Sequence, residues 1–171
     1  IDDAVALAYL LAQPRCELVG ITTVSGQPFE RAKLASAICK TAGADIPIIP
    51  GHERRLDGPT RQPDVPQMSV LPNWKHDTHF SDEGAVAFMA ETIRKNPNEV
   101  ALLAVGPMTN VSRLFNEHPD TAELLRSLHM MIGRFSTSED LPLSEWNAHC
   151  DSAAANIVYS TIAPHHTSLG L

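Results

Sequence analysis

The sequence predicts an α/β protein with an open, mostly parallel and doubly wound sheet. Short apolar runs rich in β-branched residues alternate along the chain with longer segments that show the 3.6-residue period of a helix. This regular alternation favours parallel strands joined by crossover helices on both faces of one sheet. With 171 residues, of which 43% are hydrophobic, the chain has enough apolar material for one core. We therefore expect a single domain over residues 1–171.

The first half of the chain supplies two helices and two strands. A helix is expected over 2–13, because an aspartate can cap its first amides and Pro14 follows its end. Its almost unbroken apolar sequence predicts burial on every side. The run 17–24 predicts an inner strand covered on both faces. An amphipathic helix over 29–41 and a short strand over 46–49 follow.

A long segment over 50–81 contains several prolines and few periodic apolar residues, so we expect a surface loop. Loops of this length in compact domains are often functional. Helical periodicity resumes over 84–95, and the apolar run 100–105 predicts the next strand. A turn at Gly106 and Pro107 leads into another helix.

The last third predicts a helix over 121–128, a strand over 129–132, an irregular stretch and a helix over 152–160. The residues over 165–168 are polar, at the point where an α/β fold would supply its next strand. We therefore expect the sheet to be unfinished. The chain also opens without methionine, so we expect an interior fragment of a longer protein.

Composition limits the partners and the compartment. The formal net charge is −7 and no cluster of Lys and Arg is present, which argues against a nucleic-acid partner. No apolar stretch is long enough for a membrane span and no signal peptide is visible, so no membrane partner is expected. Cys16, Cys39 and Cys150 are odd in number and widely spaced, which disfavours disulfides and fits the cytoplasm.

Candidate site residues follow the predicted strands. Ligands of open parallel sheets bind beyond the carboxyl ends of the strands. The polar residues expected at that edge are Gln27, Thr109 with Asn110, the segment from Met131 onward and, if a strand precedes residue 1, Asp2 with Asp3. These residues are far apart in the sequence, and the predicted topology brings them together.

The adjacent carboxylates of Asp2 and Asp3 have two interpretations. Two neighbouring negative charges beside an apolar helix repel each other and lose hydration, unless a cation or a set of hydroxyl donors compensates. A hard divalent ion such as calcium or magnesium would do so, because it prefers oxygen ligands. Alternatively, both aspartates cap the helix and interact with its dipole. On this pair alone the two interpretations are equally supported.

The segment SEWNAHCD over 144–151 offers a second group of polar residues. Glu145, Trp146 and Asn147 combine an acceptor, a flat apolar face and an amide, a set suited to a polyhydroxylated ring beside an aromatic base. The alternative is structural, with Trp146 as a packing anchor and Asp151 as the N-cap of the following helix.

Two other motifs have adequate structural explanations. VGPMTN, over 105–110, can simply end a strand and begin a helix. His76 and His79 flank Asp77, yet no second ligand group has regular spacing, so we expect a solvated loop there.

The segments IDDAVAL at Ile1, ITTVSGQ at Ile21, Pro50-Gly51, AVGPMTN at Ala104 and SEWNAHCDSAAANIVY at Ser144 together resemble the inosine-uridine nucleoside hydrolase family in order and spacing. The resemblance covers almost the whole chain. It implies a Rossmann-like nucleoside hydrolase fold and hydrolysis of the N-glycosidic bond of ribonucleosides with a tightly held calcium ion, as in purine and pyrimidine salvage.

The resemblance also implies roles for individual residues. Asp3 would ligate the calcium ion, and Thr109 would add its backbone carbonyl. Asp2 would bind a ribose hydroxyl, and Gln27 lies where the family usually has an asparagine that contacts the sugar. The residues matching positions that hold the ribose are Met131, Glu145 and Asn147, with Glu145 near the 5′-hydroxyl.

The chain departs from the family pattern at several places. The aspartate-rich DxDPG opening would precede Ile1, so the first strand and the general base are expected upstream of this chain. A His-Asp pair is expected beyond Leu171. Glu139 stands where the family has a sugar-binding asparagine, and the segment 73–83 lacks the HGxxG pattern. We therefore expect a domain truncated at both ends, with substrate choice left open.

The leading hypothesis is a calcium-dependent nucleoside hydrolase, with a small-molecule nucleoside as its partner and a homo-oligomeric assembly. One alternative is a noncatalytic ribose- or nucleoside-binding protein, favoured if Glu139 and the altered loop over 73–83 reflect lost chemistry. The second alternative is a metal-dependent phosphatase-like α/β enzyme. The absence of a basic phosphate clamp argues against this second alternative.

Overall fold

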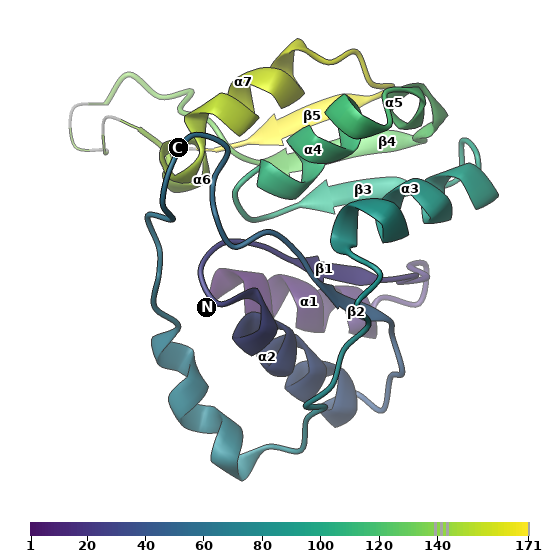
Figure 1. The fold of residues 1–171 in the computed structure, drawn as a ribbon, viewed down its shortest axis with the longest axis vertical. Coiled ribbons are helices and arrows are strands. Elements are labelled where there is room, and N and C mark those ends of the chain that lie inside the picture. Colours follow the sequence, from purple (N-terminus) through teal and green to yellow (C-terminus); the bar gives the residue numbers. More distant parts are fainter. Residues whose placement is uncertain (139, 141, 143, 171) are drawn as a thin grey trace.

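The computed structural model describes residues 1–138, 140, 142 and 144–170. The described elements follow one another as helix and strand for most of the chain (Figure 1). They are α1 (Asp2–Ala12), β1 (Ile21–Thr23), α2 (Pro28–Thr41), β2 (Ile48–Pro50), η1 (Pro66–Asn73), α3 (Ala85–Lys95), β3 (Ala101–Ala104), α4 (Thr109–Glu117), α5 (Asp120–Leu124), β4 (Ser127–Met131), α6 (Trp146–Cys150), α7 (Ser152–Ser160) and β5 (His166–Leu169).

All strand pairs in the described residues are parallel, which confirms the predicted α/β class. β1 pairs with β2, and β3, β4 and β5 pair in that order. The two ladders do not share a hydrogen-bonded edge within the described part of the chain. Figure 1 shows β3, β4 and β5 in the upper part and β1 and β2 in the lower part. The single continuous sheet expected from the sequence is therefore hydrogen-bonded as two parallel ladders.

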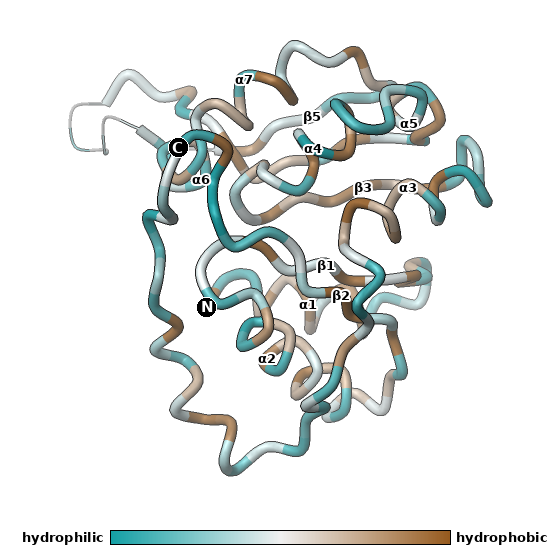
Figure 2. The backbone as a smooth tube through the Cα atoms, in the orientation of Figure 1, coloured by the Kyte–Doolittle hydropathy of each residue, from teal (hydrophilic) through white to brown (hydrophobic). Residues whose placement is uncertain are grey.

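Two hydrophobic clusters support these ladders. The larger one packs side chains of α3, α4 and α7 against β4, and Leu114, Leu128 and Val158 are fully buried in it. The smaller one lies between α1, α2 and β2, and Ala32 and Ile48 belong to it. In Figure 2, brown hydrophobic stretches of the chain lie along strands of both ladders. Because each fully buried Leu or Val contributes about 1.5–3 kcal/mol, the larger cluster fixes the positions of β3 and β4 most firmly.

The expectation that the first helix is buried on every side is wrong. None of the residues of α1 is buried, and Val5 and Tyr9 are 66% and 64% exposed. Of the residues of α1, Leu7 and Leu11 pack against the smaller cluster. Helix α1 contacts α2, which contributes residues to the same cluster. An apolar sequence predicts burial but cannot specify the partner that would cover each face.

Several boundaries differ from those predicted. Helix α5 ends at Leu124, and the expected continuation to 128 is instead the start of β4. Leu125 is extended and the amide of Arg126 donates to the carbonyl of Val100, so strand pairing overrides helical propensity here. The first strand is also shorter than predicted, with three residues in place of 17–24. Within the expected loop over 50–81, η1 forms a 3₁₀ helix.

The expectation that residues 165–168 supply no strand is wrong in the described structure. The polar residues His166, Thr167 and Ser168 lie in β5, which pairs in parallel with β4. Exposed and partly buried residues alternate along β5. A strand with one solvated face needs no continuous apolar run, which is why the sequence pattern missed it. None of the described helices is long and apolar enough to cross a membrane.

Candidate active site

A buried asparagine joins the carboxyl ends of β3 and β4. The side-chain nitrogen of Asn147 donates to the carbonyl of Val105 at 2.9 Å and to that of Met131 at 2.8 Å. Both N–H groups of the amide are thereby used, and its oxygen Oδ1 is left for a ligand. The sequence predicted Asn147 and Met131 as sugar-binding residues, and the structure places them together at this strand edge.

A second buried asparagine joins the ends of β1 and β2. Asn110 donates through Nδ2 to the carbonyl of Thr23 at 2.9 Å, and its Oδ1 accepts from the amide of His52 at 3.0 Å. Gly51 packs against both partners, since a Cβ there would lie 2.3 Å from Asn110 Nδ2 and 2.4 Å from the Thr23 oxygen. The sequence indicated Asn110 as a strand-end polar residue in the first turn of a helix, but not its bonding partners, because these lie far away along the chain.

Glu145 forms the N-cap of α6. Its carboxylate accepts from the amides of Asn147 at 2.7 Å, Ala148 at 2.9 Å and Gly133 at 3.3 Å. The bond to Gly133 fixes the turn after β4, where that glycine has a φ of 102° that other residues rarely adopt. A carboxylate accepts about four hydrogen bonds, so three local bonds leave room for about one ligand donor.

Trp146 does not act as the packing anchor that the structural interpretation expected. Its side chain is 53% exposed, and its ring lies 5.9 Å from that of His149 between centroids, tilted by 30°. Arg61 reaches the same place, where its Nη1 donates to the carbonyl of His149 at 2.7 Å. Trp146 is therefore exposed beside His149, which Arg61 also contacts, and no local sequence motif marks Arg61.

Thr109 begins α4 and is almost fully buried. Its hydroxyl donates to Asp151 Oδ2 at 2.6 Å, and its carbonyl accepts from the hydroxyl of Ser112 at 2.9 Å. Asp151 also caps α7 by accepting from the amide of Ala154, which confirms the predicted N-cap. Because Thr109 is the first residue of α4, its carbonyl also accepts the helical amide bond, so a metal ion there would share this oxygen with two protein donors.

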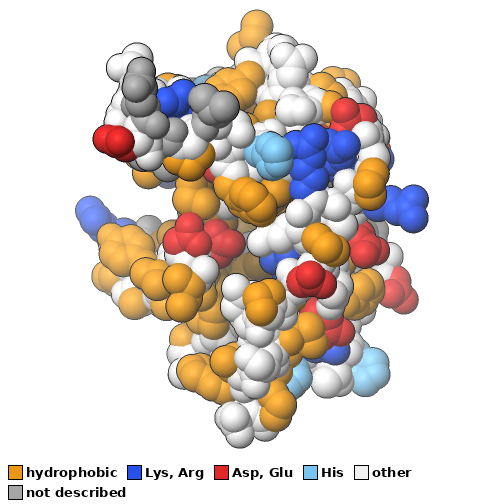
Figure 3. Space-filling model, turned by 90° about the vertical axis from the view of Figure 1, so that its left-hand side faces the viewer, with side chains coloured by type: hydrophobic (Ala, Val, Ile, Leu, Met, Phe, Trp, Pro, Cys, Tyr) orange, Lys and Arg blue, Asp and Glu red, His pale blue; other side chains and the backbone are white. Residues whose placement is uncertain are grey.

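The two leading aspartates lie in the first turn of α1, where their charges favour the helix dipole. Neither caps the helix, because its N-cap is Ile1 and has no side-chain bond. Asp2 is exposed. Figure 3 looks onto the side of the molecule where the N-terminus lies, and acidic side chains border a hollow there.

Asp3 is exposed by its surface area, yet nearby protein atoms exclude part of its water. This desolvation raises the pKa of Asp3, and the charge of Asp2 raises it further, while Arg31 acts in the opposite direction. No described residue hydrogen-bonds to Asp3 or forms an ion pair with it. Such a carboxylate fits a hard cation. Desolvation lowers the pKa of Arg31, while the charges of Asp3 and Cys150 act in the opposite direction.

Gln27 lies in the turn after β1 with a left-handed backbone, and its Nε2 donates to the carbonyl of Pro63 at 3.0 Å. Residues 60–64 lie across this turn. Arg31 also holds these residues in place, because its Nη2 donates to the backbone carbonyl of Gln62 at 3.4 Å. The predicted sugar-binding amide of Gln27 therefore keeps its oxygen and one N–H for a ligand. Nothing local in the sequence distinguishes Arg31 from other surface arginines.

The remaining predicted features lie apart from these residues. His76 bonds to the carbonyl of Trp74 and His79 contacts the hydroxyl of Thr78, both on an exposed loop. Glu139 lies outside the described residues. Within the described part of the chain, no group of three or more His, Cys, Asp or Glu side chains could hold a metal ion.

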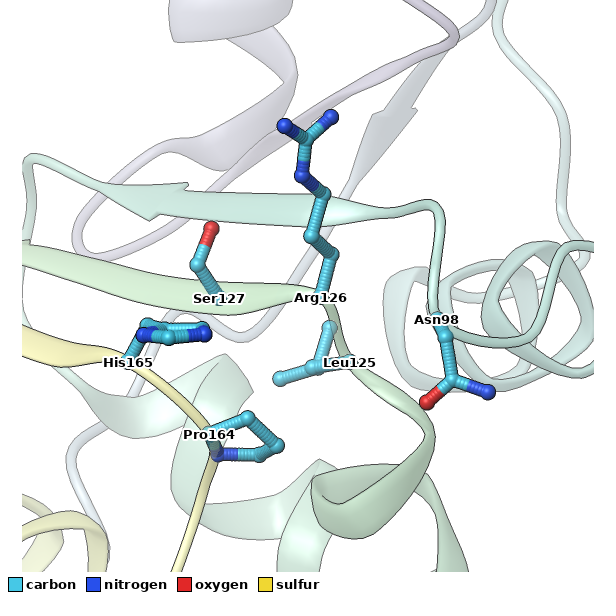
Figure 4. A pocket seen from close by; sticks show the side chains of 6 residues that line it. All are labelled: Asn98, Leu125, Arg126, Ser127, Pro164 and His165. Carbon is cyan, nitrogen blue, oxygen red and sulfur yellow. The ribbon is translucent and has the colours of Figure 1, made fainter.

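A shallow depression of about 460 Å³ lies at the other end of the strands, where β4 and β5 begin (Figure 4). Its lining residues are Asn98, Leu125, Arg126, Ser127, Pro164 and His165. In Figure 4, Arg126 points away from Pro164 and Leu125, so the charged and apolar parts of the lining do not converge. This depression is separate from the strand ends that carry the predicted site.

Comparison with solved structures supports the fold. A plant nucleoside hydrolase, PpNRh1, superposes with a TM-score of 0.89 at 23% identity, over 99% of this chain and 56% of that chain. A purine-preferring ribonucleoside hydrolase from Gardnerella vaginalis gives a TM-score of 0.86 at 23% identity, over 99% of this chain and 57% of that chain.

Among curated proteins, the pyrimidine-specific ribonucleoside hydrolase RihA of Salmonella arizonae is 29% identical over 182 residues. The match covers 95% of this chain and 55% of the relative, so the chain spans about half of that protein's length. The family model described as inosine-uridine preferring nucleoside hydrolase matches residues 1–171. The chain therefore belongs to the inosine-uridine preferring nucleoside hydrolase family.

Proposed function

We propose that the protein containing this chain hydrolyses the N-glycosidic bond of ribonucleosides to free base and ribose, with a calcium ion as cofactor. The observation that carries the proposal is the clustering of family-motif residues at one edge. Asn110 ties together the ends of β1 and β2, and Asn147 ties together those of β3 and β4. The match of the family model to residues 1–171 supports nucleoside hydrolysis as the chemistry of this edge.

The described side chains suit a reaction in which positive charge develops on the sugar. Cleavage of the bond to the base makes the ribose resemble an oxocarbenium ion, and negative charge nearby stabilises that state more than the ground state. Asp2 would accept from a ribose hydroxyl, and Gln27 would contact the sugar through its free amide groups. Glu145 and Asn147 would accept from sugar hydroxyls with the lone pairs that their backbone bonds leave free.

Asp3 and the carbonyl of Thr109 would hold the calcium ion. Both are hard oxygen donors, and Asp3 has no competing partner among the described residues. When bound, such an ion orients sugar hydroxyls and lowers the pKa of a water molecule. We assign no general base within residues 1–171.

The alternative is a noncatalytic ribose- or nucleoside-binding protein. Asn147 and Glu145 use most of their hydrogen bonds on the backbone, which favours a rigid binding edge with or without catalysis. Incubation of the full-length protein with purine and pyrimidine ribonucleosides, followed by chromatography of free base, distinguishes the two. Base release that stops on calcium chelation and returns on calcium addition supports the enzyme. Nucleoside binding without base release supports the alternative.

We further propose a cytoplasmic location and a homo-oligomeric assembly. Cys16, Cys39 and Cys150 are all free, and burial raises the pKa of the Cys39 and Cys150 thiols, as expected for unreactive cysteines in a reducing compartment. Sedimentation of the full-length protein measures the assembly.

A further inference from the structure

Asp151 is a fully buried carboxylate to which neither the sequence motifs nor the proposed mechanism gives a role beyond capping. Its side chain is 0% exposed. No Lys, Arg or His of the described chain forms an ion pair with it. A buried charge without a counter-charge is costly unless several donors surround it. Hydrogen-bond donors from the surrounding chain must therefore compensate for the burial of this carboxylate.

Three donors from three separate segments meet at this carboxylate. Oδ2 accepts from the hydroxyl of Thr109 at 2.6 Å and from the amide of Leu56 at 3.0 Å, and Oδ1 accepts from the amide of Ala154 at 3.1 Å. An O–H to O distance of 2.6 Å lies in the range of charge-assisted hydrogen bonds. Capping of α7 needs only the bond to Ala154. The other two bonds link α7 to the start of α4 and to the chain that follows β2.

The bond to Thr109 bears directly on the proposed calcium site. Thr109 is β-branched, and a hydrogen bond at its hydroxyl selects one rotamer and fixes the first turn of α4. That turn contains the carbonyl assigned to the ion. Partners of metal ligands orient those ligands, and their loss typically costs 10- to 100-fold in metal affinity.

We propose that Asp151 is a positioning residue for the calcium site, acting through its hydrogen bond to Thr109. The bond fixes the backbone that carries the ligand carbonyl. This inference rests on the proposed function. It goes beyond it by assigning a task to a residue outside the predicted ligand set.

The test is calorimetric titration of calcium into the full-length protein after removal of metal with a chelator. Thr109→Val deletes the hydroxyl and keeps the backbone carbonyl, and we expect it to weaken calcium binding about 10- to 100-fold. Asp151→Asn should weaken binding to a similar degree. The double variant should bind calcium no more weakly than the single variant with the lower affinity, because both substitutions break the same hydrogen bond between Thr109 and Asp151. Thr109→Ser restores the hydroxyl and should regain most of the lost affinity.

Thr121→Val is the matched control. Thr121 is also fully buried, and its hydroxyl donates to the carbonyl of His118 at 2.7 Å. It lies in α5, which precedes the start of β4 and not its carboxyl end. This variant loses an equivalent hydrogen bond and should keep calcium affinity within about threefold. A purely structural role of the buried hydroxyls would affect Thr109→Val and Thr121→Val alike, which would overturn the inference.

The remaining outcomes are also decisive. Unchanged calcium affinity in Thr109→Val, with binding by the wild type, overturns the inference and leaves the proposed function standing. No calcium binding by the wild type overturns both. If Asp151→Asn does not fold, the comparison of Thr109→Val with Thr109→Ser decides, because equal affinities in these two variants contradict a role for the hydroxyl.

Discussion

The side-chain amide of Asn110 donates to the carbonyl oxygen of Thr23 at 2.9 Å, across 87 positions of the chain. This bond connects the first turn of α4, the helix that follows β3, with the end of β1. The ladder of β1 and β2 and the ladder of β3, β4 and β5 share no strand pairing in the described residues. Buried side-chain hydrogen bonds at the strand ends therefore contribute to the association of the two parallel ladders.

Replacement of Asn110 by alanine should destabilise the protein strongly. It removes two buried hydrogen bonds and leaves the Thr23 carbonyl and the His52 amide without these partners, at about 1–3 kcal/mol for each buried group. Urea denaturation followed by circular dichroism measures the loss. Asn116→Ala, an exposed position of the same helix, is the control and should change stability by less than about 0.5 kcal/mol. Equal effects of the two variants would contradict the role given to Asn110.

Gly51→Ala should be among the most destabilising single changes at this edge. The new Cβ would lie 2.4 Å from the oxygen of Thr23, and backbone cannot move aside as a flexible side chain can. We expect a loss of about 3 kcal/mol or more, measured by thermal unfolding. Gly43→Ala is the control, because nothing lies within 4 Å of its Cβ position and only its φ of 70° opposes the change. That strain alone costs about 1–2 kcal/mol, and an equal loss at both positions would show that Gly51 is not sterically restricted.

Asn147→Asp should destabilise the protein at neutral pH and less so in acid. The substitution replaces the two N–H donors by an oxygen that faces the carbonyls of Val105 and Met131. Protonation of the new carboxyl restores one donor, so the loss relative to the wild type should shrink as the pH falls. The free energy of unfolding of both proteins between pH 8 and 4 checks this. Asn96→Asp, at an exposed amide that also donates to a carbonyl, should show a much smaller effect. A loss at position 147 that is independent of pH would be inconsistent with the assigned amide orientation.

The ion pair between Lys40 and Asp77 should make part of the stability depend on pH. A hydrogen bond from Lys40, and a second from Ser36, lower the pKa of Asp77 in the folded protein. A lowered folded pKa means that this contribution is fully present above the ordinary aspartate pKa and is lost as the pH falls through the lowered value. The stability difference between the wild type and Asp77→Asn should therefore be largest near neutral pH and vanish in strong acid. A difference that persists in acid would assign the effect to packing.

The fold class was predictable because it depends on local pattern, whereas the extent of burial was not. The parallel arrangement follows from the alternation of apolar runs and helical segments, and the structure confirms it. The sequence of α1 predicted burial all round, yet Val5 and Tyr9 are exposed. Propensity describes what a segment can bury and not which partner covers it. β5 was missed for the converse reason, since its polar residues do not form an apolar run.

The candidate site was predictable where the chemistry lies in short motifs. Glu145, Asn147, Met131 and Thr109 lie at strand ends or in the helices that follow them. The hydrogen bonds that use up most of Asn147 and Glu145 could not be predicted, because their partners come from other elements. Asp151 was indicated as an N-cap, and its bond to Thr109 spans 42 positions with no local signal.

The central claim is that this strand edge belongs to a calcium-dependent nucleoside hydrolase in which Asp3 holds the ion. The most direct test is kcat/KM for base release from ribonucleosides by the full-length wild type and by Asp3→Asn, at saturating calcium. Asp45→Asn, the same change at an exposed position, is the control. We predict a loss of about a hundredfold or more for Asp3→Asn and no more than about twofold for the control. Base release by Asp3→Asn at the wild-type rate would contradict the claim.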